Sequence, residues 1–134
     1  MLLLILYQEQ MLLKDFYKIL KKENLSDGLA NWQIELNATH EIFGGHFPGN
    51  PITPGVVMIQ TIKEIVEELL GKSMFLESAD NVKFMAIINP ETDPVLDMEI
   101  KIEQREDKYK VKNIARFGET VALKFSGTFR VIEK

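Results

Sequence analysis

The chain has 134 residues, 46% of them hydrophobic and 27% charged, a balance typical of one globular domain and not of a disordered, collagen-like or membrane-spanning chain. Sixteen Lys and Arg against 20 Asp and Glu leave a net charge of -4, which argues against a broad positive face for nucleic acid. The absence of cysteine excludes disulfides, thiolate metal sites and a cysteine nucleophile.

The N-terminal segment is apolar but brief. Residues 1–7 carry no positive charge and polar residues follow at 8–10, so the segment does not fit a secretory signal and is too short to span a bilayer. We therefore expect a cytoplasmic protein without a membrane span. A second Met at position 11 suggests an N-terminal extension over residues 1–15, followed by a single domain over 16–134.

Two β-strands joined by a turn are predicted first. Residues 16–25 and 29–37 flank a polar triplet that ends in glycine, and Trp32, Ile34 and Leu36 alternate onto one face, which favours a β-hairpin. Apolar residues within 12–22 also fit a helical stripe, so an amphipathic helix there stays open as an alternative.

A long helix should follow a loop rich in glycine and proline. Thr53 and Pro54 are typical of an N-cap and a first helical residue, and Gly71 is a typical C-terminal stop, so the helix should end near Leu70. Its apolar residues, beginning with Val56, recur at three- and four-residue steps, and its first turns are apolar nearly all round. We expect those first turns to be buried.

Four extended segments complete the chain, over residues 74–88, 95–105, 108–117 and 120–132. One mostly apolar helix facing five to six antiparallel strands predicts an α+β fold in which a curved sheet wraps around the helix.

The segment from His46 to Val56 carries the strongest chemical signal. The imidazole offers a base near neutral pH, and its loop leads directly into a helix N-terminus with exposed backbone N–H groups. This pairing suits removal of a proton α to a thioester carbonyl while N–H donors hold the developing oxyanion. Considered alone, a histidine in such a loop is more often a structural hydrogen-bonding residue. Two histidines without cysteine or suitably spaced carboxylates give no case for a metal.

The pattern His-Phe-Pro-Gly-x-Pro-x-x-Pro-Gly is matched here from His46 to Gly55 at every fixed position. It resembles the signature of the β-hydroxyacyl-acyl-carrier-protein dehydratases of the hot-dog fold, and the resemblance extends over residues 16–132. It implies a hot-dog enzyme that removes water from (3R)-hydroxyacyl thioesters of acyl carrier protein, in fatty-acid or related acyl-chain biosynthesis. The resemblance also implies a homodimer or higher oligomer, and no cofactor, because the substrate brings its own phosphopantetheine arm.

The resemblance assigns roles to individual residues. His46 would be the base and the Gly55 N–H would hold the thioester oxygen. The family carries its catalytic Glu or Asp fourteen positions after the histidine, where this chain has Gln60. An amide cannot transfer a proton at neutral pH, but Glu64 lies one helical turn further along the same face, so Gln60 or Glu64 would handle the leaving water. The acyl channel would be lined by Phe43, Phe47 and Val57.

Several alternatives remain at this stage. Glu64 fits equally well on a solvated stripe with its charged neighbours Lys63, Glu67 and Glu68. Two rival functions also stay open: a hot-dog acyl thioesterase, in which a helix carboxylate or a bound water attacks the carbonyl, and a catalytically degenerate, acyl-thioester-binding partner subunit, which Gln60 favours. His40 is interpreted as structural. An acidic carrier protein would need a local basic cluster, either Lys21 with Lys22 or Lys110 with Lys112 and Arg116.

Overall fold

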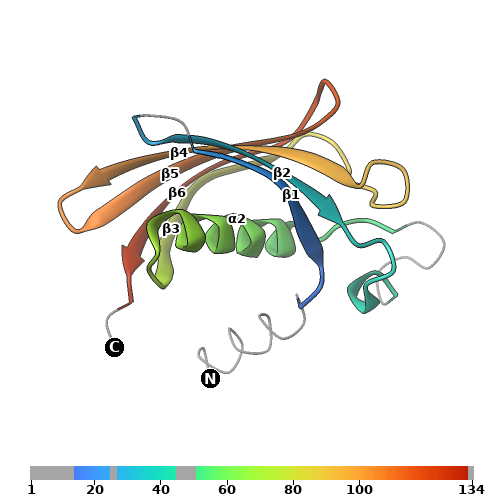
Figure 1. The fold of residues 1–134 in the computed structure, drawn as a ribbon, viewed down its shortest axis with the longest axis horizontal. Helices are drawn as coiled ribbons and strands as arrows, with labels where there is room; N and C mark the ends of the chain where they lie inside the picture. The colour runs from blue at the N-terminus through green and yellow to red at the C-terminus, as the bar shows by residue number, and fades with distance from the viewer. Residues whose placement is uncertain (1–13, 25–26, 45–50, 133–134) are drawn as a thin grey trace.

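The structure is a computed structural model that describes residues 14–24, 27–44 and 51–132. Within these ranges all the strands join one antiparallel sheet in the order β1-β2-β4-β5-β6-β3, and Figure 1 shows this sheet curving over a single long helix. The predicted α+β arrangement is therefore confirmed. The elements are β1 (Tyr17–Asn24), β2 (Leu29–Leu36), the 3-10 helix η1 (Glu41–Phe43), α2 (Gly55–Leu70), β3 (Met74–Phe84), β4 (Val95–Arg105), β5 (Lys108–Phe117) and β6 (Thr120–Val131).

The first two strands form the predicted hairpin, and the helical alternative over 12–22 is wrong for residues 17–22. β1 pairs with β2 from Tyr17 opposite Leu36 to Asn24 opposite Ala30. Every second residue of β2 is buried, which satisfies the alternation seen in the sequence. Gly28 adopts φ +76, a left-handed conformation that glycine reaches without strain.

The core lies between one side of α2 and the concave face of the sheet. Met58, Ile62, Ile65 and Val66 of the helix are fully buried, and they form one core cluster with buried side chains of β2, β3, β4, β5 and β6. α2 ends as predicted, because Gly71 takes a left-handed φ of +65 and its N–H caps the Glu67 carbonyl. Among the described residues, no helix is both long and apolar enough to cross a membrane.

The start of α2 differs from the prediction by one residue. Pro54, not Thr53, is the N-cap, with an extended ψ of 142, and Gly55 is the first helical residue. Because Pro54 is extended, it cannot be the first helical residue, and the cap moves from Thr53 to Pro54. The Thr53 N–H is bonded to the Ile88 carbonyl at 3.0 Å. This bond ties Thr53 to the chain that follows β3, and the buried Thr53 hydroxyl has no partner among the described residues.

Two further expectations are corrected at the same end of the molecule. Val56 is 59% exposed, so the first turn of α2 is not buried all round. The third strand stops at Phe84, although the N–H groups of Met85 and Ala86 still reach the Ala122 carbonyl of β6. Phe84, Met85 and Ile87 are all more than half exposed. β3 is an edge of the sheet, so this exposed apolar segment continues an unpaired edge.

Candidate functional site

The helix face turned away from the sheet carries a row of polar side chains: Gln60, Lys63, Glu64 and Glu67. Gln60 is only 6% exposed and Lys63 only 8%. Buried polar groups cost free energy unless they are hydrogen-bonded, so their partners indicate what the row does.

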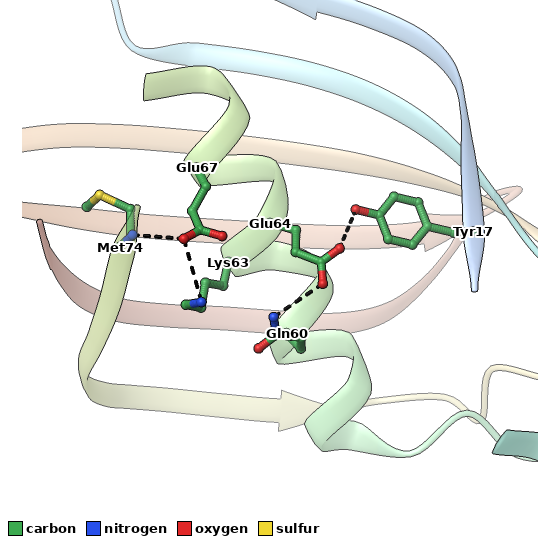
Figure 2. A network of polar contacts seen from close by, with 6 residues as sticks. All are labelled: Tyr17, Gln60, Lys63, Glu64, Glu67 and Met74. Atoms are coloured by element: carbon green, nitrogen blue, oxygen red, sulfur yellow. Dashed lines mark hydrogen bonds and ion pairs between the residues drawn. The ribbon is translucent and has the colours of Figure 1, made fainter. Parts of the chain in front are cut away.

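Glu64 is held from two sides, as Figure 2 shows. The Tyr17 hydroxyl, which comes from β1, donates to Glu64 Oε1 at 2.9 Å. The Gln60 amide donates from Nε2 to Glu64 Oε2 at 3.2 Å. Both carboxylate oxygens therefore accept a hydrogen bond, and the residue at the family's acid position is in direct contact with the nearest carboxylate along the helix.

The Tyr17 hydroxyl keeps its proton and donates it in the hydrogen bond to this carboxylate. Its burial and the neighbouring Glu64 raise the pKa of the phenol well above its usual value near 10. The position of the Tyr17 ring is also restrained, because it packs edge-on against Phe16 with ring centroids 6.4 Å apart. Tyr17 thus remains protonated across the pH range of ordinary biochemistry.

A second contact chain ties the other half of the row to β3. Lys63 Nζ lies 3.6 Å from Glu67 Oε2, and the same oxygen accepts the Met74 N–H at 2.8 Å. Of the four charged residues in the predicted solvated stripe, only Glu68 is exposed, and it pairs with Lys22 of β1. The alternative of a solvated stripe is therefore wrong for Lys63, Glu64 and Glu67.

The N-terminus of α2 presents unused donors beside an aromatic ring. The first helical hydrogen bonds come from Val57 and Met58, which both reach the Pro54 carbonyl, and the N–H groups of Gly55 and Val56 meet no acceptor among the described residues. A Cβ at position 55 would overlap the Phe84 ring, lying 3.0 Å from two of its carbons. Gly55, the predicted oxyanion donor, thus lets the Phe84 ring lie directly against the start of the helix.

The other predicted site residues are placed unevenly. His46 and Phe47 lie outside the described residues. Phe43 is 5% exposed and packs against Phe16 with ring centroids 5.6 Å apart, and Val57 is also 5% exposed. Both belong to the core in the structure, and their role in an acyl channel stays a prediction.

His40 has the contacts of a structural residue, in agreement with its interpretation from the sequence. Its Nδ1 accepts the Ile42 N–H at 3.1 Å and so caps η1. Its Nε2 lies 2.9 Å from the Lys14 carbonyl, which requires the proton on that nitrogen. Both ring nitrogens are occupied.

Sequence reasoning missed Tyr17 and the burial of Lys63. Tyr17 stands 47 residues before Glu64, and no local spacing connects them. A weak signal existed in the hairpin itself, because Tyr17 opposes the inward-facing Leu36 and so points toward the helix. Lys63 offered no signal, since its charged neighbours make it look like part of an exposed face.

Comparison with known proteins gives a consistent picture. Residues 21–125 match the family model of the ApeI dehydratase. The chain is similar to the 3-hydroxyacyl-[acyl-carrier-protein] dehydratase FabZ of Caulobacter sp. (strain K31), with 34% identity over 68% of this chain and 61% of that protein. It is also similar to FabZ of Pediococcus pentosaceus, with 32% identity over 77% of this chain and 72% of that one. The aligned part thus spans less than two thirds of the Caulobacter relative.

Solved structures share the fold. The dehydratase heterocomplex ApeI:P from Xenorhabdus doucetiae matches with a TM-score of 0.69 and 22% identity, covering 84% of this chain and 96% of that one. A hypothetical thioesterase with coenzyme A from Streptococcus pneumoniae matches with a TM-score of 0.65 and 14% identity, over 96% of this chain and 98% of that one. At these identities the likeness concerns the fold alone.

Proposed function

The chain belongs to the ApeI-like dehydratase family, and from this premise we propose that it removes water from (3R)-hydroxyacyl thioesters of acyl carrier protein to give trans-2-enoyl thioesters. The single observation that best supports an active enzyme is the contact between Gln60 and Glu64 at 3.2 Å. It keeps a carboxylate beside the position where the family carries its acid.

The proposed elimination divides its steps among a few residues. His46 takes the proton α to the thioester carbonyl, and the Gly55 N–H stabilises the negative charge that develops on the carbonyl oxygen. The electron pair then forms the double bond between Cα and Cβ as the Cβ–O bond breaks. The Gln60 and Glu64 pair holds the leaving hydroxyl, which takes up the proton that His46 removed from Cα and departs as water.

A homodimer is part of the proposal. The resemblance implies that the site is completed across an interface, and the exposed apolar residues Val56, Phe84, Met85 and Ile87 support an interface at the start of α2 and the edge beyond β3. A cytoplasmic location and the absence of a cofactor remain predictions from the sequence.

An acidic carrier protein would dock on the outer face of the sheet. Of the two predicted clusters, the one at Lys21 and Lys22 is weaker, because Lys22 pairs with Glu68 and lies 5.1 Å from the Trp32 ring centroid. Lys112, in the other cluster, is exposed.

Further lysines extend that second cluster across four strands. Lys101 stands opposite Lys112, and Lys83 stands opposite Lys124. Lys101, Lys112 and Lys124 line a surface cavity of about 670 Å³, which the acidic Asp27 and Glu99 also line. Like charges directly opposite one another are unfavourable, so an anionic partner would relieve the repulsion between these lysines.

Lys112→Glu should weaken carrier binding and reduce its salt dependence more than Lys21→Glu does.

The reaction is tested with the purified full chain and a 3-hydroxyacyl carrier substrate, following the enoyl product by mass. We expect the enoyl thioester to form, and His46→Ala to abolish its formation without changing the thermal melt. Release of free acid and carrier thiol would instead identify a thioesterase. No product from the chain alone would favour the partner subunit. Either of these results would overturn the proposed function.

A further inference from the structure

The polar contacts around Glu64 decide which end of the Gln60 amide is offered to a ligand. Tyr17 donates to Oε1 of Glu64, and burial keeps that phenol protonated, so the carboxylate acts as an acceptor. An accepting oxygen can bind only the NH₂ end of an amide. Gln60 therefore turns Nε2 toward Glu64, and Figure 2 shows Oε1 on the opposite side of the amide group.

We infer that Tyr17 and Glu64 hold the Gln60 amide in one orientation so that its Oε1 accepts a hydrogen bond from the 3-hydroxyl of the acyl chain. This inference rests on the proposed function for its substrate class and deepens it. Gln60 touches the substrate in this scheme, whereas Tyr17 is a positioning residue that acts through Glu64. No described residue donates a hydrogen bond to Gln60 Oε1.

The fixed orientation sets a specificity that a freely rotating amide would not have. A 3-hydroxyacyl chain presents a hydroxyl donor and is accepted by Oε1. A 3-oxoacyl chain presents only a carbonyl acceptor, so its oxygen would lie against Oε1 without a proton between them. An unrestrained glutamine would rotate and offer Nε2 to the ketone, and the discrimination would disappear.

Tyr17 is suited to this role because its own position is determined by other contacts. Its ring packs edge-on against the fully buried Phe16, and its strand is anchored by the hairpin with β2. The neighbouring Glu68, which also faces β1, is engaged by Lys22. Tyr17 is thus the strand residue that restrains Glu64 in the described part of the chain.

The test measures binding with two matched probes. Pantetheine amides that carry a 3-hydroxyacyl or a 3-oxoacyl chain of equal length are titrated into the full protein, because the amide suppresses elimination during the measurement. We expect the parent protein to bind the hydroxy probe about tenfold more tightly than the oxo probe. Tyr17→Phe should reduce this preference to within about twofold, mainly by weakening the hydroxy probe.

Two more variants make the result specific. Glu64→Gln should also remove the preference, because a second amide can accept or donate and no longer orients Gln60. The variant that combines Tyr17→Phe with Glu64→Gln should show the same probe preference as Glu64→Gln alone, since Tyr17 acts only through Glu64. Tyr109→Phe is the matched control, because it also removes one tyrosine hydroxyl. That hydroxyl accepts a hydrogen bond from Lys72 Nζ at 3.3 Å, and it lies on β5 outside this network. The control variant should retain the full preference.

Each outcome bears on a separate statement. A parent protein without preference between the probes would overturn the inference, as would a Tyr17→Phe variant that keeps the preference or weakens both probes equally. Should Tyr17→Phe fail to fold, Glu64→Gln alone carries the same test. A protein that prefers the hydroxy probe but never converts the 3-hydroxyacyl carrier substrate would refute the proposed function and leave the inference standing.

Discussion

Burial and the Glu64 carboxylate raise the pKa of Tyr17, so the folded protein holds this proton more tightly than the unfolded chain, in which tyrosine titrates near 10. Above that pH the unfolded state binds fewer protons than the folded one, and the free energy of unfolding falls as the pH rises. Below about pH 10 this contribution to stability is fully present.

We therefore expect the free energy of unfolding to drop between about pH 9 and about pH 11, and to drop less in Tyr17→Phe. Urea unfolding at the two pH values measures the difference. Lys108, whose pKa is raised by its hydrogen bond with Glu77, titrates in both proteins and cancels in the comparison. Equal drops in the two proteins would refute the assignment.

Glu64 and Gln60 can be separated by their effects on turnover. If Glu64 is needed to handle the leaving water, Glu64→Gln should lower kcat by about 100-fold, the usual loss of an acid or base group. Gln60→Ala should mainly raise KM, because it removes a binding contact. The opposite pattern, with Glu64→Gln unchanged and Gln60→Glu more active, would identify a degenerate site that regains the family's acid.

The site was predictable from the sequence only where its residues are neighbours on one helix. Gln60 and Glu64 are four positions apart, and that spacing alone places them on one face, as the structure confirms. Tyr17 joins them only through the register of β1 against β2, which local patterns do not determine. The burial of Lys63 depends on tertiary packing and contradicts its apparently solvated context.

At the scale of elements, the turn between β1 and β2 depends on Gly28. A Cβ at this position would overlap the Ile102 carbonyl oxygen, and φ is +76. Neither problem can be relieved by a side-chain rotation, since the carbonyl belongs to β4 and the Ile102 N–H is bonded to the Gly28 carbonyl at 2.8 Å. Gly28→Ala should cost about 2 kcal/mol or more of unfolding free energy.

Gly71→Ala is the natural comparison for that substitution. Gly71 also has a left-handed φ, of +65, but a Cβ there would meet nothing within 4 Å. It should cost only the conformational strain, about 1 kcal/mol. Denaturant titration of both variants separates the two contributions, and equal losses would show that the Ile102 contact is unimportant.

The elements themselves were largely predictable, with errors where two patterns compete. Both a helix and a strand suit the apolar residues before Lys22, and only pairing with β2 decides for the strand. Thr53 has the chemistry of an N-cap, but Pro54 after it stays extended and is itself the cap. In the case of β1, a contact with a distant segment overrides a local preference.

At the scale of the whole molecule, the apolar segment after β3 indicates the edge of the sheet at which the proposed homodimer would form. Ile87 is 65% exposed on this side, whereas Leu20 is 42% exposed on β1 at the opposite edge. Ile87→Asp should convert the dimer to a monomer, because an interface core does not tolerate an unpaired charge. Leu20→Asp should leave the dimer intact. Sedimentation at micromolar concentration measures both variants, and the reverse result would assign the interface to β1.

The strand order also determines when that edge becomes available. β4, β5 and β6 form successive hairpins. β3 pairs with β6, although β4 and β5 lie between them in the sequence, and the pairing runs from Met74 opposite Val131 to Phe84 opposite Leu123. Closing this large loop costs chain entropy before any contact repays it, so we expect β3 to dock late in folding and its amides to exchange with solvent sooner than those of β5. If the second copy binds along this late strand, completion of the fold and association become one kinetic step, and refolding should accelerate as the protein concentration rises.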